Sequence, residues 1–263
     1  MSVVDLRLTE SGEGRPLMLL HAFPLASALF DGVRGGLPGW RVLTPDLRGF
    51  GGSPLGDDAP SLSEMAGDVE AVLDRLGIDV AVVGGVSMGG YVVMELLRRC
   101  PQRLSGVLLI DTKAGADTEQ ARDGRLAMAD AVLEQGRRVL DPLVDGLLGA
   151  TTRAERPDVV SRVRQWLDMA APASVSWAQR AMAARPDSLV TLAAAGIPGA
   201  VVVGEEDVLS PLGEAQAMAA ALGSGVLTVP RTGHLAVLED PEGAATALRA
   251  ALDELTGTGG QAV

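Results

Sequence analysis

The chain has 263 residues, of which 47% are hydrophobic, so it is long enough for one large domain or for one domain with an insertion. Its 22 basic and 34 acidic side chains give a formal net charge of −12, which argues against a nucleic-acid partner and favours a soluble protein. The single cysteine, Cys100, excludes an internal disulfide and fits a reducing, cytoplasmic location. We expect no signal peptide, because residues 1–8 lack a basic region followed by an apolar one, and no membrane partner, because no apolar run approaches the ~18 residues of a span.

Short apolar runs alternate with helical patterns over the first 114 residues. A weak alternation predicts an edge strand at residues 2–8, and further strands are expected at residues 16–21, 40–45, 80–83 and 104–110. Helices are expected at residues 27–37, 62–76 and 91–99. Two of the strands lack period-2 alternation, which is typical of a parallel sheet covered by helices on both faces.

The alternation stops after the strand at residues 104–110. From residue 117 to residue 185 the chain shows only helical patterns, at residues 118–135, 137–148, 157–169 and 174–184. Such a block predicts a helical insertion that lies over the sheet. The alternation resumes with strands at 200–204 and 225–230 and helices at 211–222 and 241–255, and residues 256–263 are expected to be a disordered tail.

A glycine-rich turn joins the apolar run at residues 80–83 to the helix that follows it. The turn reads Gly85-Val86-Ser87-Met88-Gly89, which is the G-x-S-x-G pattern of a nucleophile elbow. Such an elbow holds its serine in a strained conformation above the sheet, and it needs glycines where strand and helix close up on each other. The N-terminus of the next helix favours negative charge developing at the serine. Ser87 is therefore the candidate nucleophile.

A serine hydroxyl needs a base within hydrogen-bond reach, and that base needs a third group to orient it. The chain has two histidines, His21 and His234. His234 follows a predicted strand late in the chain, where the order nucleophile, acid, histidine that accompanies this elbow places the base. His21 comes too early for that order, and we expect it to orient its own loop through side-chain hydrogen bonds.

The orienting acid is expected between Ser87 and His234 in the chain. Asp207 follows the strand at residues 200–204 and precedes a helix, which suits a carboxylate turned toward the histidine. Three other acidic residues are alternatives: Glu205, Glu206 and Asp111. An ion-binding cluster at residues 205–207 is a weaker interpretation, because three consecutive residues do not all point at one ion. We therefore expect no metal.

Acyl transfer also needs two donors for the oxyanion of a tetrahedral intermediate. The backbone N–H of Met88, directly after the nucleophile, is expected to supply one of them. The second is expected from the loop at residues 21–24, which follows an early strand. Since Pro24 has no N–H, we assign this donor to Phe23.

Together these motifs resemble the α/β-hydrolase superfamily over nearly the whole chain. The resemblance rests on five stretches: His21-Ala-Phe-Pro24, Asp46-Leu-Arg-Gly-Phe-Gly-Gly-Ser53, Gly85-Val-Ser-Met-Gly-Gly90, Gly204-Glu-Glu-Asp207 and Gly233-His234. It implies an α/β fold with a mostly parallel eight-stranded sheet and helices on both faces. Residues 1–114 and 186–255 would form the core, and residues 115–185 would form a helical cap. One departure is Ala22, where most relatives have glycine.

Within the superfamily the chain looks like small esterases, the enol-lactonase of 3-oxoadipate breakdown and the cofactor-free haloperoxidase or perhydrolase group. A serine nucleophile argues against haloalkane dehalogenases and epoxide hydrolases, which use aspartate. The resemblance implies a serine hydrolase that cleaves small carboxylic esters or lactones through an acyl-enzyme without a cofactor. The alternatives are a C–C hydrolase, a perhydrolase and, from another class, a non-catalytic small-molecule receptor on the same fold.

Residues 115–185 are expected to shape the substrate pocket. Three side chains of this segment are candidates to line it: Trp166, Trp177 and Met128. A dicarboxylate substrate would need an arginine facing inward, and four are available: Arg125, Arg162, Arg164 and Arg180. A homodimer formed through the cap or an edge strand is the one macromolecular partner that the sequence leaves open.

Overall fold

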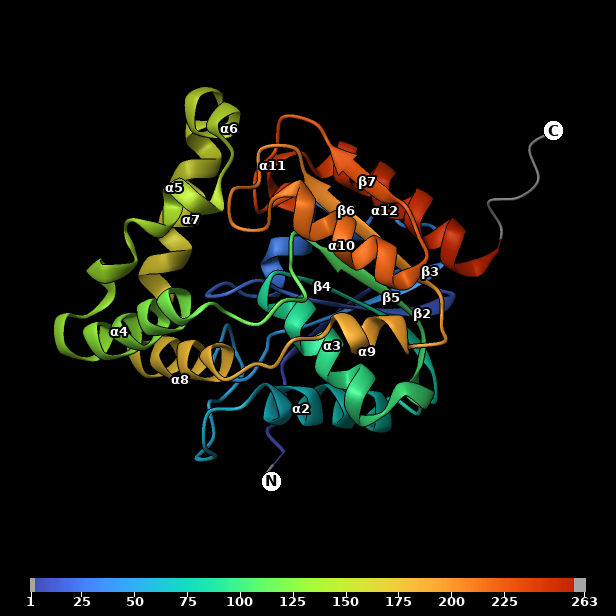
Figure 1. Cartoon of the computed structure of the whole chain (residues 1–263), viewed down its shortest axis with the longest axis horizontal. Helices are drawn as coiled ribbons and strands as arrows, with labels where there is room; N and C mark the ends of the chain where they lie inside the picture. The colour runs from blue at the N-terminus through green and yellow to red at the C-terminus, as the bar shows by residue number, and fades with distance from the viewer. Residues whose placement is uncertain (1–2, 258–263) are drawn as a thin grey trace.

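The computed structural model describes residues 3–257, which fold into a mostly parallel sheet flanked by helices (Figure 1). Within these residues the sheet has seven strands, one fewer than expected: β1 (Leu8–Ser11), β2 (Arg15–Leu20), β3 (Trp40–Pro45), β4 (Ala81–Val86), β5 (Leu104–Ile110), β6 (Gly199–Gly204) and β7 (Val226–Val229). Their order is β1-β3-β2-β4-β5-β6-β7, and β1 alone runs antiparallel to its neighbour. The carboxyl ends of β2–β7 therefore meet at one edge.

The chain just before β1 lies outside the sheet, so the predicted edge strand at residues 2–8 is wrong. Its backbone is held mainly by side chains, and by one bond from the Asp46 N–H to the Arg7 carbonyl oxygen at 2.8 Å, without strand pairing. The Val4 N–H donates to Asp68 Oδ1 at 2.9 Å, and the Arg7 N–H donates to Ser53 Oγ at 2.9 Å. The edge strand begins at Leu8, where the pairing with β3 starts.

Helices cover both faces of the sheet. Those that contact one another on one face are α1 (Asp31–Arg34), α11 (Ala236–Glu239) and α12 (Pro241–Thr256), beside the 3₁₀ turn η1 (Ser27–Phe30). The other face carries α2 (Leu62–Arg75), α3 (Met88–Arg99), α9 (Leu189–Ala193) and α10 (Leu212–Leu222), with the turn η2 (Pro101–Arg103) after α3. Part of the predicted tail belongs to α12, which ends at Thr256; residues 258–263 lie outside the described residues.

A separate group of helices stands at one side of the sheet, between β5 and β6 in the sequence (green to yellow in Figure 1). It consists of α4 (Glu119–Gln135), η3 (Arg137–Leu140), α5 (Leu143–Leu147), α6 (Ala150–Glu155), α7 (Pro157–Met169) and α8 (Pro172–Ala183). The helix predicted at residues 137–148 is divided near Pro142, and α6 was not predicted. Within residues 3–257, every helix is too short or too polar to cross a bilayer.

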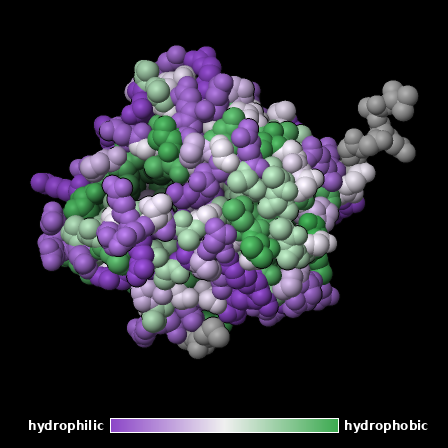
Figure 2. Space-filling view, in the orientation of Figure 1, coloured by the Kyte–Doolittle hydropathy of each residue, from purple (hydrophilic) through white to green (hydrophobic). Residues whose placement is uncertain are grey.

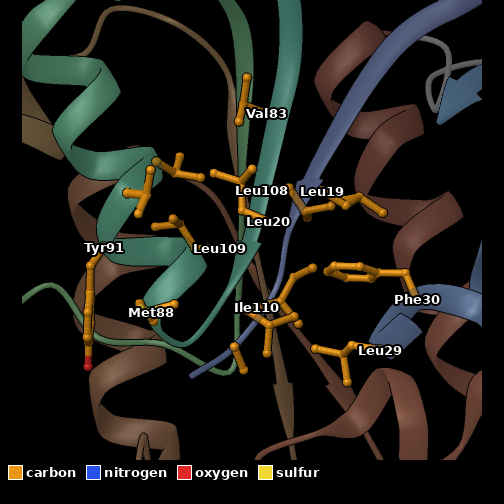
Figure 3. Close-up of a cluster of buried hydrophobic side chains, with 14 of the residues drawn as sticks. Leu19, Leu20, Leu29, Phe30, Val83, Met88, Tyr91, Leu108, Leu109 and Ile110 are labelled. Carbon is orange, nitrogen blue, oxygen red and sulfur yellow. The ribbon is translucent and has the colours of Figure 1, made fainter. Parts of the chain in front are cut away.

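The central strands are buried on both faces, and their side chains pack against the flanking helices. In Figure 3 the leucines of β2 and β5 meet Met88 of α3 and Phe30 of η1. Leu19, Leu108 and Ile110 are fully buried. This packing fixes the strand ends from which the site loops project.

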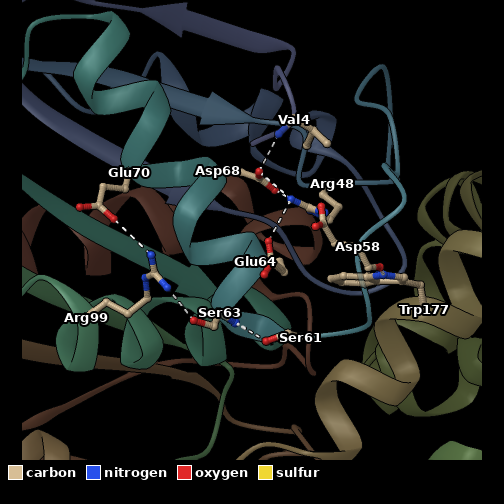
Figure 4. Close-up of polar contacts among 10 residues, drawn as sticks. All are labelled: Val4, Arg48, Asp58, Ser61, Ser63, Glu64, Asp68, Glu70, Arg99 and Trp177. Carbon is tan, nitrogen blue, oxygen red and sulfur yellow. Dashed lines mark hydrogen bonds and ion pairs between the residues drawn. The ribbon is translucent and has the colours of Figure 1, made fainter. Parts of the chain in front are cut away.

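A buried arginine joins the core to α8 (Figure 4). The side chain of Arg48 is fully buried and makes a bidentate pair with Asp68, at 2.7 and 2.9 Å, and a third bond to Asp58 at 3.1 Å. The Trp177 ring lies 5.6 Å from the Arg48 guanidinium, and its Nε1–H donates to the Asp58 carbonyl at 2.8 Å. Trp177 is therefore an anchor of α8 on the core.

Candidate active site

Ser87 sits in a sharp turn between β4 and α3. Its backbone has φ 53° and ψ −113°, a strained conformation for a residue with a side chain. A Cβ atom on Gly85 would lie 2.2 Å from the carbonyl carbon of Gly89, and one on Gly89 would lie 2.1 Å from the carbonyl oxygen of Leu20. The two glycines of the motif are thus required by backbone contacts on both sides of the serine.

His234 and Asp207 come together from loops that follow β7 and β6. His234 Nδ1 and Asp207 Oδ2 are hydrogen-bonded at 2.8 Å, and both side chains are buried. The other Asp207 oxygen, Oδ1, accepts from the N–H groups of Leu209 and Ser210, at 2.8 and 3.0 Å. Burial alone would raise the pKa of Asp207, but the His234 ring and these amide donors outweigh it and lower the pKa.

The three alternative acids have other partners. Asp111 accepts from the N–H groups of Gly204 and Ala236, at 2.7 and 3.1 Å, and so joins β6 to the loop of His234. Glu205 accepts from the Arg231 N–H, and Glu206 accepts from the N–H and hydroxyl of Thr151 in α6. The consecutive carboxylates at residues 205–207 therefore point to different partners. Within residues 3–257, no His, Cys, Asp and Glu side chains are grouped so that they could hold a metal ion.

Ser87 and His234 line one open cavity of about 370 Å³ between the strand ends and the helices of residues 119–183. Much of the remaining wall is apolar: Phe23, Tyr91, Met128, Leu143, Leu147 and Met182. Figure 2 shows a hollow bordered by hydrophobic residues between the α4–α8 pair and the α5–α7 segment. The two side chains do not hydrogen-bond to each other here, and such contacts often tighten only when substrate binds.

Two backbone donors lie at Ser87. Met88 is the first residue of α3, so its N–H has no acceptor one turn earlier in the helix. Phe23 lines the cavity, and within the described residues its N–H donates to no protein acceptor. Neither amide therefore has a protein acceptor in the part of the chain that the structure describes.

His21, the first residue of the loop at residues 21–24, is fully buried and does not line the cavity. Its Nδ1 lies 2.9 Å from the Ala22 carbonyl oxygen, and its Nε2 accepts from the Leu47 N–H at 2.8 Å. Burial lowers its pKa to about 4, which matches a neutral ring that accepts at Nε2. These contacts give His21 the loop-orienting geometry that the sequence predicts.

The structure separates the three predicted pocket residues. Met128 lines the cavity of Ser87. Trp166 does not; it lines a second cavity of about 380 Å³ together with Phe50, and Trp177 is held by Arg48 and Asp58. Both tryptophans are therefore misplaced in the prediction, because the 3.6-residue period identifies a buried helix face but not what that face contacts.

Of the four arginines considered for an inward position, Arg125 lines the cavity. Arg180 pairs with Asp130 at the surface, and Arg162 and Arg164 are exposed. The sequence analysis missed Lys113 and Asp117, which also line the cavity. Lys113 lies three residues beyond β5, at the edge where the other site loops gather, and that position was a usable signal.

A model described as the alpha/beta hydrolase family matches residues 17–247. The chain belongs to the alpha/beta hydrolase family. This family assignment agrees with the sheet order, the elbow at Ser87 and the late position of His234.

Among alpha/beta hydrolases, a thermophilic esterase from Thermogutta terrifontis, solved with malate bound, is 35% identical, with a TM-score of 0.92 over 96% of this chain and 94% of that one. The 3-oxoadipate enol-lactonase 2 of Acinetobacter baylyi is 28% identical over 209 residues, which is 76% of this chain and 74% of that protein. The similarity to the AB hydrolase superfamily protein YisY of Bacillus subtilis is more local. It is 36% identical over 98 residues and covers 36% of this chain and 37% of that protein.

Proposed function

We propose that the chain hydrolyses small carboxylic esters or lactones through an acyl-enzyme on Ser87. The observation that carries this proposal is the buried 2.8 Å contact between His234 Nδ1 and Asp207, with His234 lining the same cavity as Ser87. A carboxylate on Nδ1 leaves Nε2 of the ring as the atom that takes a proton from a serine hydroxyl. No metal or organic cofactor enters this chemistry.

In the proposed reaction, His234 removes the proton of the Ser87 hydroxyl as its oxygen attacks the substrate carbonyl. The oxyanion that forms is held by the N–H groups of Phe23 and Met88, and losing one such donor typically costs about 3–4 kcal/mol of transition-state stabilisation. His234 then protonates the alcohol oxygen as its bond to the carbonyl carbon breaks, and the acyl group remains on Ser87 as an ester. A water molecule activated by the same ring releases the acid.

Asp207 stabilises the imidazolium that forms at His234 during both steps. The pKa of Asp207 is lowered first by His234 and then by the amide donors of Ser210 and Leu209, which favours the ionised carboxylate. The helices of residues 119–183 act as a cap in this proposal, since α4, α5 and α8 supply much of the cavity wall. The related esterase supports ester substrates, and the related enol-lactonase supports lactones.

The proposal is tested with para-nitrophenyl acetate as substrate. Ser87→Ala should lower kcat by about a thousandfold or more, because it removes the nucleophile. Ser105, an exposed serine on β5, provides the matched control, and Ser105→Ala should keep the wild-type rate. Wild-type turnover in the Ser87→Ala protein, with its circular dichroism unchanged, would refute the proposal.

A further inference from the structure

The cavity of Ser87 has a cationic wall, although the whole chain carries a formal net charge of −12. Lys113 and Arg125 line this wall, and Arg185 stacks over the ring of Tyr91 at 4.2 Å beside it. Asp117 supplies the carboxylate of this wall, and Glu214, which is not part of the cavity lining, also acts on Lys113. The cluster therefore carries two more positive than negative formal charges.

Asp117 is already shared by two guanidinium groups. Its Oδ2 accepts from Arg125 Nε at 2.6 Å and lies 2.7 Å from Arg185 Nη1. Arg125 is held further by Gln179, whose Oε1 accepts from Arg125 Nη1 at 3.2 Å. Both arginines are thus fixed, and the one negative charge of Asp117 is set against their two positive charges before Lys113 is counted.

That third cation is Lys113, which is half-buried in the cavity wall. In the part of the chain that the structure describes, it makes no ion pair and no hydrogen bond. Burial lowers the pKa of Lys113, and Arg185 and Arg125 lower it further, whereas Asp117 and Glu214 raise it. An ammonium group without a partner in such a place is unfavourable until an anion meets it.

The position of Lys113 relative to Ser87 follows from the sheet. β4 and β5 are parallel neighbours in which Val86 pairs with Ile110, so the residues after them leave the same edge. Ser87 follows Val86 directly, and Lys113 lies three residues after Ile110. Since both line one cavity of about 370 Å³, a single small ligand reaches both.

We propose that Lys113, supported by Arg125, binds a carboxylate group of the substrate while the ester or lactone carbonyl lies at Ser87. This inference rests on the proposed function. The aliphatic wall formed by Met128, Leu143, Leu147 and Met182 suits a short methylene chain between the two groups. One ammonium group without an ion-pair partner suits one carboxylate, so the substrates inferred are half-esters of dicarboxylic acids and lactones that carry a carboxylate.

The test compares two pairs of esters that differ in charge. In the first pair the acyl group varies, with para-nitrophenyl hydrogen glutarate against para-nitrophenyl pentanoate. In the second pair the alcohol varies, with para-acetoxybenzoate against para-acetoxybenzamide. The wild-type protein should prefer the anionic member of at least one pair by about 10- to 100-fold in kcat/KM, mainly through a lower KM.

Lys113→Met should bring that ratio close to one, and Lys113→Arg should restore part of it. The matched control is Arg122→Met, which removes an exposed charge from α4 outside the cavity and should keep the wild-type ratio. An unchanged ratio in Lys113→Met for both pairs would overturn the inference. A loss of thermal stability without a change in that ratio would also overturn it, because it would mean that Lys113 serves to neutralise the buried Asp117.

Calorimetry with glutarate separates this inference from the proposed function. The probe is glutarate itself, titrated into Ser87→Ala protein, which needs no catalysis. Binding that weakens about tenfold or more in the Ser87→Ala, Lys113→Met double variant supports the anion site even if no ester is turned over. Equal binding by both proteins overturns it, whatever the esterase assays show.

Discussion

Asp111 and Asp207 are two buried carboxyl groups whose charges act on each other, yet only Asp207 contacts His234. Burial, and then the charge of Asp207, raise the pKa of Asp111 well above its usual range, whereas the pKa of Asp207 is lowered. The two carboxyl groups therefore differ in the direction of their pKa shifts as well as in their partners. This difference separates a structural acid from the proposed catalytic one.

Asp207→Asn should lower kcat for para-nitrophenyl acetate by about 10³- to 10⁴-fold, because the amide no longer stabilises a protonated His234. Asp111→Asn should lower kcat by less than about tenfold, but it should reduce the free energy of unfolding by about 1–3 kcal/mol. The reason is that the new NH₂ group would face one of the two backbone N–H groups that donate to Asp111, so that two donors would meet and that hydrogen bond would be lost. Steady-state rates and urea unfolding measure the two effects. A severe loss of kcat in Asp111→Asn with a mild loss in Asp207→Asn would assign the acid to Asp111.

The glycines of the elbow should tolerate no side chain. Gly89→Ala would place a Cβ 2.1 Å from the Leu20 carbonyl oxygen, a contact that only backbone movement relieves. We expect a loss of more than about 3 kcal/mol in the free energy of unfolding, measured by urea titration. Gly213→Ala in α10 is the control, since open space surrounds that position, and it should leave stability unchanged or slightly higher. A stable, active Gly89→Ala protein would show that the strand and helix are not packed this closely.

Arg48 should contribute far more to stability than an exposed arginine with similar bonds. Arg48→Ala leaves Asp68 buried without its counter-ion, and we expect the free energy of unfolding to fall by about 3–5 kcal/mol. Arg41 also contacts one carboxylate, that of Glu10, through two nitrogens, but both side chains are partly exposed. Arg41→Ala should cost about 1 kcal/mol or less. Similar losses of unfolding free energy in Arg48→Ala and Arg41→Ala would contradict the role assigned to the buried contacts of Arg48.

His21 predicts a specific pH dependence of stability. Its pKa is about 4 in the folded protein and about 6.5 in an unfolded chain, so between these values the unfolded state binds the extra proton. Stability from this residue is therefore complete above about pH 6.5 and is lost as the pH falls toward 4. Relative to His21→Gln, the wild-type protein should lose about 2 kcal/mol of unfolding free energy between about pH 7.5 and pH 5. The same pH dependence in both proteins would show that the buried ring is not held neutral.

Residues that contact neighbours through the sheet were predictable from the sequence. The runs around Leu17 and Val107 become buried strands, and the glycines at positions 85 and 89 indicated the elbow. The proximity of Asp207 and His234 was also predicted, because parallel strands bring the loops after β6 and β7 to the same edge. In these cases local pattern and sheet topology agree.

The predictions that were wrong or missing concern residues whose surroundings depend on contacts between distant elements. Trp177 has the helical spacing of a buried residue, but only the fold shows that it packs on Arg48 and not in the cavity. The segment before β1 alternates like a strand, yet Asp68 and Ser53 bind its backbone. Lys113 has no periodic signal at all, and its lack of a partner appears only once Arg125 and Arg185 are seen to share Asp117.

The acyl-enzyme on Ser87 is tested most directly by covalent labelling with a fluorophosphonate, followed by mass spectrometry of the intact protein and of its peptides. We predict one adduct per chain, on the peptide that contains Ser87, and a loss of para-nitrophenyl acetate hydrolysis in proportion to labelling. The Ser87→Ala protein should take up no label. An unlabelled wild-type protein, or labelling of Ser87→Ala with activity retained, would contradict the account and favour a receptor that binds its ligand without turning it over.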